Sequence, residues 1–243
     1  MNRTIMGFVV GALLVGFAGV PRASANEQTF TFSGMAGGES VSATAVFTVG
    51  PGGQLTIQLT NNTMNFQDAG QLLVGLSFGF TGGNGTPTLG SESGDEVKIG
   101  SGGTVTSLGA GNPSWGFAAN GSTVLFADIA QSVGGLSAQG SSVPGLTLIG
   151  TPCLGGSYCD ANGSIDSNKP HNPFVSGALT LTLTIPGLTN VDQINNVNFY
   201  FSTTSGVSGP GTPQSPTPEP SSLFLLGTGL IGLGAAIRRR SVA

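Results

Sequence analysis

The stretch "ALTLTLTIP", residues 178–186, has the most regular pattern in the chain. Leu181, Leu183 and Ile185 alternate with threonines. Side chains of a β-strand point to opposite faces with a period of two residues, so the aliphatic side chains would share one face and the threonines the other. The pattern predicts a half-buried β-strand and sets the expectation for the rest of the chain.

Six further stretches predict strands. Apolar and polar residues alternate in three of them, two are more continuously apolar, as strands buried on both faces would be, and one is rich in aromatic residues. In that order they are residues 28–32, 41–49, 54–60, 71–80, 122–130 and 196–201. Glycine, proline and asparagine clusters separate them. Short strands at this spacing predict an all-β fold, namely a single antiparallel β-sandwich or jelly-roll-like domain over residues 26–202. A short helix over Asp68–Val74 is a loosely supported addition.

The first 25 residues have the features of a signal peptide. Arg3 precedes an apolar run over residues 5–20, and the small residues Ala23 and Ala25 suit signal peptidase. We expect cleavage after Ala25, while an uncleaved membrane anchor is the alternative.

A polar segment follows the predicted domain. Residues 203–217 are rich in serine, threonine, glycine and proline. Proline favours extended polyproline II conformations, so this composition predicts a semi-rigid spacer rather than a strand.

The last segment, residues 218–243, contains an uncharged stretch over residues 221–237. As a helix it would be about 25 Å long, at the short end of what crosses a bilayer core of roughly 30 Å. Arg238, Arg239 and Arg240 follow it and would remain in the cytoplasm as a stop-transfer signal. A single transmembrane helix is therefore expected here, and its glycines would allow another helix to approach closely, either in a dimer or in a membrane enzyme.

The triplet Pro218, Glu219 and Pro220, then an apolar helix, then an arginine cluster resembles the PEP-CTERM sorting signal of Gram-negative bacteria. The resemblance implies recognition by an exosortase, a membrane-embedded protease. It also implies that the protein is anchored transiently in the inner membrane, loses its tail, and reaches the cell surface or the exopolysaccharide matrix. The resemblance covers this tail and not the domain that precedes it.

Charge limits the partners of the exported part. Residues 26–220 hold eleven acidic residues but only Lys98 and Lys169 as basic ones, a formal charge of −9. Nucleic-acid binding requires basic patches, so nucleic acid is not expected as a partner.

The two cysteines, Cys153 and Cys159, are separated by "LGGSY". In an exported protein such a pair predicts a disulfide that closes a small loop. A metal site is the alternative, although two thiols would need further ligands.

Oxygen-bearing side chains recur after the second cysteine, and Asp160, Asn162 and Asp166 form a weak calcium candidate. The match is poor, because Ile165 stands where such a loop needs glycine. A solvated turn is the favoured interpretation, and the acidic run at residues 92–96 has an equally weak claim to a cation. We therefore expect no metal and no cofactor.

No catalytic constellation stands out. His171 is the only histidine, and Trp115, the only tryptophan, would suit the core better than a sugar-stacking platform. The sequence predicts a non-enzymatic, exported surface or matrix protein, structural or adhesive within exopolysaccharide or biofilm. The alternatives are a secreted carbohydrate-binding or carbohydrate-active protein with the same delivery signal, and an uncleaved single-pass membrane protein.

Overall fold

The computed structural model describes residues 26–140, 146–166, 171–203 and 207–214. The predicted signal peptide, transmembrane helix and sorting triplet lie outside these residues, as does Lys169. The described part of the chain holds no helix long and apolar enough to cross a membrane.

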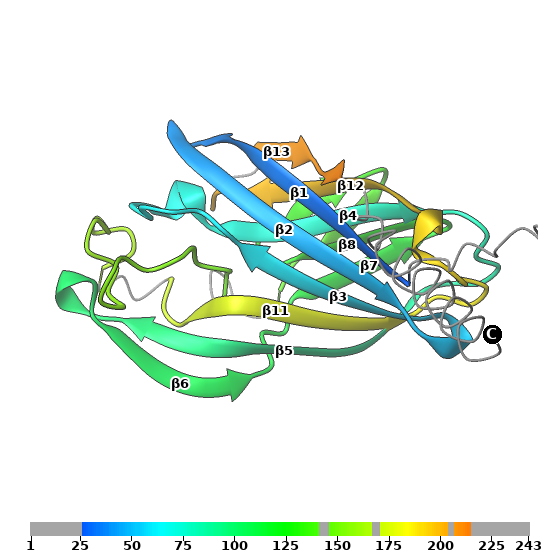
Figure 1. Cartoon of the computed structure of the whole chain (residues 1–243), viewed down its shortest axis with the longest axis horizontal. Coiled ribbons are helices and arrows are strands. Elements are labelled where there is room, and N and C mark those ends of the chain that lie inside the picture. The colour runs from blue at the N-terminus through cyan, green and yellow to red at the C-terminus, as the bar shows by residue number, and fades with distance from the viewer. Residues whose placement is uncertain (1–25, 141–145, 167–170, 204–206, 215–243) are drawn as a thin grey trace, which may run out of the picture.

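The larger of two main sheets has seven strands (Figure 1). In spatial order they are β14 (Thr212–Pro213), β1 (Glu27–Ala36), β2 (Glu39–Val49), β3 (Gln54–Asn61), β11 (Phe174–Thr184), β5 (Thr88–Ile99) and β6 (Val105–Gly111). The alternating leucine and threonine stretch thus forms most of a central strand, β11, over residues 178–184.

The smaller sheet has five strands, and a separate hairpin lies beside it. In spatial order the five are β13 (Val207–Pro210), β12 (Ile194–Phe201), β4 (Leu73–Phe80), β8 (Thr123–Ala127) and β7 (Gly116–Asn120). The hairpin consists of β9 (Gln131–Val133) and β10 (Leu136–Ala138). Every pairing between these named strands is antiparallel, which confirms the prediction of an all-β, antiparallel fold.

The two sheets share one apolar core. Phe47 of β2 meets Phe78 of β4 edge-to-face with ring centroids 5.2 Å apart, and it meets Phe30 of β1 edge-to-face at 5.4 Å. Aromatic pairs favour this geometry and add to the stabilisation from burial. In Figure 1 the smaller sheet lies behind the β1–β3 part of the larger one, whereas β5 and β6 extend beyond it.

A second apolar cluster covers the opposite face of the smaller sheet. Along β8, Val124 and Phe126 enter the main core, while Leu125 and Ala127 enter the second cluster. The hairpin and Tyr158 of the disulfide loop close that cluster from outside. β4 is buried at all eight positions, so the prediction of strands buried on both faces is confirmed for β4 and for most of β8.

The predicted helix over Asp68–Val74 is wrong. Only a three-residue 3₁₀ turn, η2 (Ala69–Gln71), forms there, and its N-terminus is capped by the Asp68 carboxylate, which accepts the Gly70 N–H at 2.7 Å. Such caps satisfy free N–H groups at the start of a helical turn. The continuous apolar run that follows forms β4 instead. Its side chains are buried in the apolar clusters on the two faces of the smaller sheet.

The structure also differs from the expected spacer. Within residues 203–217 it places β13 on β12 and β14 on β1. The ring of Phe32 packs directly over Gly209, at a position where a Cβ would collide with it. Glycine and proline make the composition of this segment similar to that of a linker. The absence of a side chain at Gly209, however, allows β13 to pack against Phe32 of β1. The folded unit thus continues to residue 214.

Candidate functional site

A groove of about 500 Å³ lies between β1, β12 and the β13–β14 segment. Two residues of the short 3₁₀ turn η4 (Val191–Gln193), Val191 and Asp192, also line it. We call it the amide groove, because five of its lining residues carry amide or carboxylate groups, namely Gln28, Asp192, Asn195, Asn196 and Asn198. The others are Phe30, Val191, Ile194, Val197, Pro210, Gly211 and Pro213.

A β-bulge in β12 presents these amides. The register between β12 and β4 shifts between Asn195 and Asn198, and Asn196 adopts a left-handed backbone conformation with φ 48°. Asparagine tolerates this conformation better than most residues. Bulges redirect side chains. In this case Asn196 lies exposed on the groove wall instead of alternating regularly into the core.

The amide nitrogens of the groove are largely occupied. Asn198 Nδ2 donates to the Asn196 carbonyl at 2.9 Å, Asn195 Nδ2 to the Gln193 carbonyl at 3.3 Å, and Gln28 Nε2 to the Gln214 carbonyl at 2.6 Å. Within the described residues no hydrogen bond engages the side-chain oxygens of these three amides. The side-chain oxygens of Gln28 and Asn198 are therefore left as acceptors, whereas Asn195 Oδ1 lies over Gly79 of β4.

Among the described residues that line the groove Asp192 is the one carboxylate, and it is exposed. None of the described residues that line the groove is basic, so this lining does not favour phosphate or another anion. Neutral amides beside apolar proline faces suit a ligand with many hydroxyl groups, since a hydroxyl both donates and accepts hydrogen bonds.

The predicted disulfide between Cys153 and Cys159 is confirmed. A second hollow, of about 530 Å³, lies beside it and exposes Met64 and Leu154. Asp160 also lines this hollow, and its carboxylate lies within 4.8 Å of both sulfur atoms. Because the two sulfurs are bonded to each other, they cannot serve as thiolate ligands, and the metal alternative for this cysteine pair does not fit.

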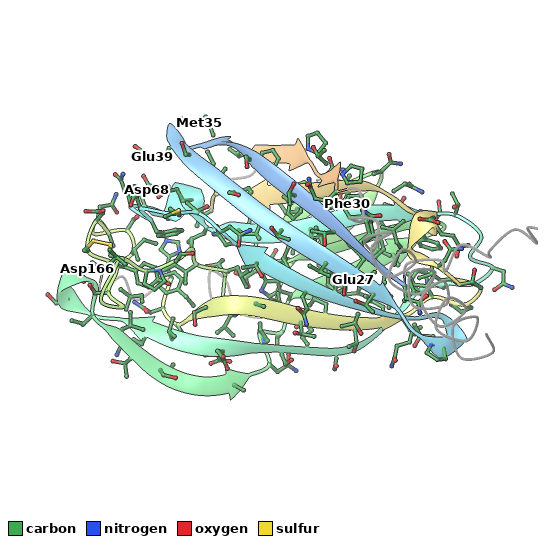
Figure 2. The ribbon with its side chains drawn as sticks, viewed as in Figure 1. Glu27, Phe30, Met35, Glu39, Asp68 and Asp166 are labelled. Carbon is green, nitrogen blue, oxygen red and sulfur yellow. A yellow bond between two sulfur atoms is a disulfide. The ribbon has the colours of Figure 1, made fainter. Side chains whose placement is uncertain are left out.

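Two of the three calcium candidates make hydrogen bonds that shape turns. Asn162 Oδ1 accepts the Ser164 N–H at 2.8 Å, and Asp166 Oδ2 accepts the Gly102 N–H at 3.0 Å. Figure 2 shows Asp166 at the same end of the molecule as the disulfide. Ile165, which lies between Asn162 and Asp166 in the sequence, is fully buried. These contacts support the interpretation as a structural turn.

Trp115 is buried, so the stacking-platform alternative is wrong. Its indole N–H donates to the Leu146 carbonyl at 3.0 Å, and its backbone N–H donates to Glu92 Oε2 at 2.8 Å. Burial raises the pKa of the Glu92 carboxyl above its usual 4.5, and hydrogen bonds from the Trp115 and Ser114 backbone oppose this rise.

The acidic run at residues 92–96 is part of β5, a strand that we did not predict. Glu92 points into the protein, whereas Asp95 is exposed. The alternation of a strand thus separates carboxylates that looked like one cluster in the sequence.

His171 is half-buried, and its burial lowers the pKa of the imidazole. Both cysteines are in the disulfide, which rules out a cysteine–histidine nucleophile. The amide groove and the disulfide hollow contain one carboxylate each among the described residues, whereas most glycoside hydrolases use two.

Comparison with known proteins identifies the tail. The family model described as PEP-CTERM protein-sorting motif matches residues 216–240, which include both Pro218–Pro220 and Arg238–Arg240. The match confirms the resemblance, so the chain carries a sorting signal for exosortase-dependent export. Neither the curated proteins nor the solved structures contain a match to this chain.

Proposed function

We propose that this PEP-CTERM cargo is a non-enzymatic protein of the cell surface or extracellular matrix, with a structural or adhesive role in exopolysaccharide. The observation that carries the proposal is the sorting motif at residues 216–240, which follows directly on a folded all-β domain. In this proposal signal peptidase removes residues 1–25, and exosortase removes the tail after Pro218, Glu219 and Pro220 have reached the outer side of the inner membrane.

The amide groove is the surface that we propose contacts polysaccharide. It is bounded by β12 and by the segment that leads to the sorting signal. Its acceptors and exposed proline faces fit neutral sugar units, whereas the acidic surface of the domain would repel strongly anionic chains. Weak contacts of this kind become effective when one long polymer engages many copies of the protein.

The absence of catalysis is part of the proposal. The one deeply buried carboxylate–tryptophan pair, Glu92 and Trp115, has no access to solvent comparable to that of the groove. A hydrolase would need an acid and a base on either side of its substrate. Of these two groups, the described lining of the groove supplies one carboxylate, Asp192.

Intact-mass measurement of the protein released by the producing cells tests the delivery. We expect a mass that lacks residues 1–25 and also lacks the arginine cluster. Deletion of Arg238–Arg240 should reduce release. A released protein whose mass still includes Leu223–Arg240 would overturn exosortase processing.

Co-sedimentation with the polysaccharide fraction of the same cells tests the groove. We expect Asp192→Ala combined with Asn195→Ala to lower the bound fraction severalfold. Asn120→Ala, at an exposed asparagine of β7, is the matched control and should bind like the unmodified protein. Equal binding by all three proteins would exclude the groove, and no binding by the unmodified protein would overturn the matrix role.

A further inference from the structure

The folded domain ends very close to the sorting triplet. Gln214 is the last residue that the structure describes, and its backbone N–H donates to the Thr29 carbonyl of β1 at 2.8 Å. Only residues 215–217 separate Gln214 from Pro218 in the sequence. An extended chain covers at most about 3.6 Å per residue, so Pro218 can lie no more than about 14 Å from Gln214. An enzyme that acts on the triplet therefore works beside the surface of the domain.

Gln214 is held through its side chain as well as its backbone. Its carbonyl accepts the side-chain amide of Gln28 at 2.6 Å, and its own side-chain amide donates to Thr31 Oγ1 at 2.8 Å. These bonds, with the pairing of Thr212 and Thr31, hold β14 on β1. Residues 212–214 are all exposed, however. Exposed hydrogen bonds compete with water, and a segment with few buried contacts opens easily, so β14 is weakly attached.

The chain is anchored more firmly just before β14. Gly209 is buried beneath the Phe32 ring, and a Cβ on Gly211 would lie 2.9 Å from the ring of Phe199. The Gly211 N–H donates to the Val197 carbonyl at 2.8 Å, and β13 pairs with β12 along its whole length. In Figure 1 β13 lies beside both β1 and β12. β14 can therefore leave β1 while β13 stays in place, with the permissive backbone of Gly211 between them.

The attachment of β14 decides how much chain an enzyme can hold before the triplet. Extended peptides commonly bind by pairing their backbone with the receptor, and residues that already pair with β1 are not free to do so. With β14 docked, the free residues before Pro218 are 215–217. With β14 detached they are 212–217, which is twice as many.

We propose, on the basis of the exosortase processing proposed above, that β14 detaches from β1 when exosortase engages the sorting signal. It docks again once the tail has been removed. Pro213 and Gly211 line the amide groove, so docking of β14 also completes the wall of that groove. The released protein has the finished groove, whereas the protein held by the enzyme does not.

A disulfide that locks β14 in place tests the detachment, with the full chain expressed in the producing cells. Thr31→Cys with Thr212→Cys joins residues that lie directly opposite each other on β1 and β14. Opposite residues of an antiparallel pair are close enough for such a bridge. We expect the fraction of protein that keeps its tail, measured by intact mass, to rise severalfold. Processing of the locked variant at the normal rate would overturn the proposal.

The control is a lock on the other side of β1. Ser33→Cys with Ser42→Cys joins β1 to β2 at two hydroxyls that lie 3.5 Å apart, and it leaves β14 free. This variant should be processed like the unmodified protein. Peptide mapping without reductant checks that each engineered bridge has formed and that Cys153 is still joined to Cys159. A processing defect of equal size in the control would overturn a specific role of β14.

A linker separates a shortage of free chain from a folding defect. A flexible glycine–serine linker of about six residues, inserted between Gln214 and Ser215 of the locked variant, supplies free chain while β14 stays docked. We expect processing to recover. A locked variant that keeps its tail despite the linker would overturn the proposal. A tail retained by the unmodified protein would instead overturn the exosortase processing on which the proposal rests.

Discussion

Glu92 of β5 accepts a hydrogen bond from the backbone N–H of Trp115, just before β7, with 2.8 Å between Oε2 and the nitrogen. Both residues are buried, and within the described residues the other carboxylate oxygen, Oε1, has no hydrogen-bond partner. The contact links the larger sheet to the smaller one. The Glu92 carboxylate therefore loses most of its hydration on folding, and hydrogen bonds within the described residues replace only part of it.

Glu92→Gln should therefore change how stability depends on pH. Because the folded-state pKa of Glu92 is raised, its favourable contribution is complete below pH 4.5 and is lost as pH rises through the folded pKa. Glutamine can still accept the Trp115 N–H and carries no charge. We expect the stability of the variant relative to the unmodified protein to increase from pH 4 to pH 7, as measured by urea unfolding. Asp95→Asn, an exposed neutralisation on the same strand, is the control, and a pH-independent difference for Glu92→Gln would contradict the prediction.

Asn61 connects three segments from a buried position. Its Nδ2 donates to the carbonyls of Gln71 and Leu148 at 2.9 and 3.0 Å, and its Oδ1 accepts the Thr63 N–H at 3.1 Å. Asn61→Ala should cost about 2 kcal/mol, because buried polar groups lose their partners. Its neighbour Asn62 is half-buried, and its side-chain amide donates to the Thr44 hydroxyl. Equal losses of unfolding free energy for Asn61→Ala and Asn62→Ala would show that burial of Asn61 does not matter.

The disulfide should stabilise the fold by a modest amount. Cys153 and Cys159 are six positions apart, and closing so short a loop reduces the entropy of the unfolded chain by an amount equivalent to about 2 kcal/mol. The double replacement Cys153→Ser and Cys159→Ser should lower the unfolding free energy by that amount in denaturant titrations. The loop should keep its position, because Tyr158 donates its hydroxyl to the Gly150 carbonyl at 2.8 Å and its N–H to the Gly103 carbonyl at 2.9 Å. Unchanged stability would show that these two hydrogen bonds alone hold the loop.

Gly209→Ala should loosen the segment before the sorting signal. A methyl group there collides with the ring of Phe32, which itself packs against Phe199 and Phe201. Overpacking of this kind costs about 1–3 kcal/mol. Limited proteolysis should cut the variant more rapidly near β13. Gly163→Ala is the control, because its Cβ would meet open space and its backbone is not left-handed. Identical cleavage of the two variants would contradict the prediction.

Sequence patterns predicted the strands that have two distinct faces or two buried faces. Residues 41–49 and 54–60 match β2 and β3 closely, because one side of each strand enters the main core. The sequence patterns did not predict β5 and β6, because these strands lack a consistently buried face. Over much of their length both faces are exposed, so Thr88–Ser91 and Val105–Ala110 show no alternation of buried and exposed residues. Hydrogen bonds to β11 keep β5 in the sheet, and local sequence does not encode those bonds.

The amide groove was also beyond prediction. Gln28, Asp192 and Asn198 come together only because β1, β12 and β14 meet at one edge. A bulge turns Asn196 outward, and its presence depends on the register between β12 and β4. The sequence offered one usable signal, the repeated asparagines at residues 195, 196 and 198, since asparagine is unusual within a strand.

By itself the sequence determined the all-β class and the route of export. The alternation of apolar and polar residues along a strand is a local property of the sequence. The sorting motif is also local, because it is one contiguous segment. Both can therefore be read without knowledge of the fold. Only the tertiary structure decided that the acidic run is divided between two faces and that one neutral edge strand is left open. These features depend on which distant strands become neighbours and in which register, because burial, hydrogen-bond partners and free edges arise only from those pairings.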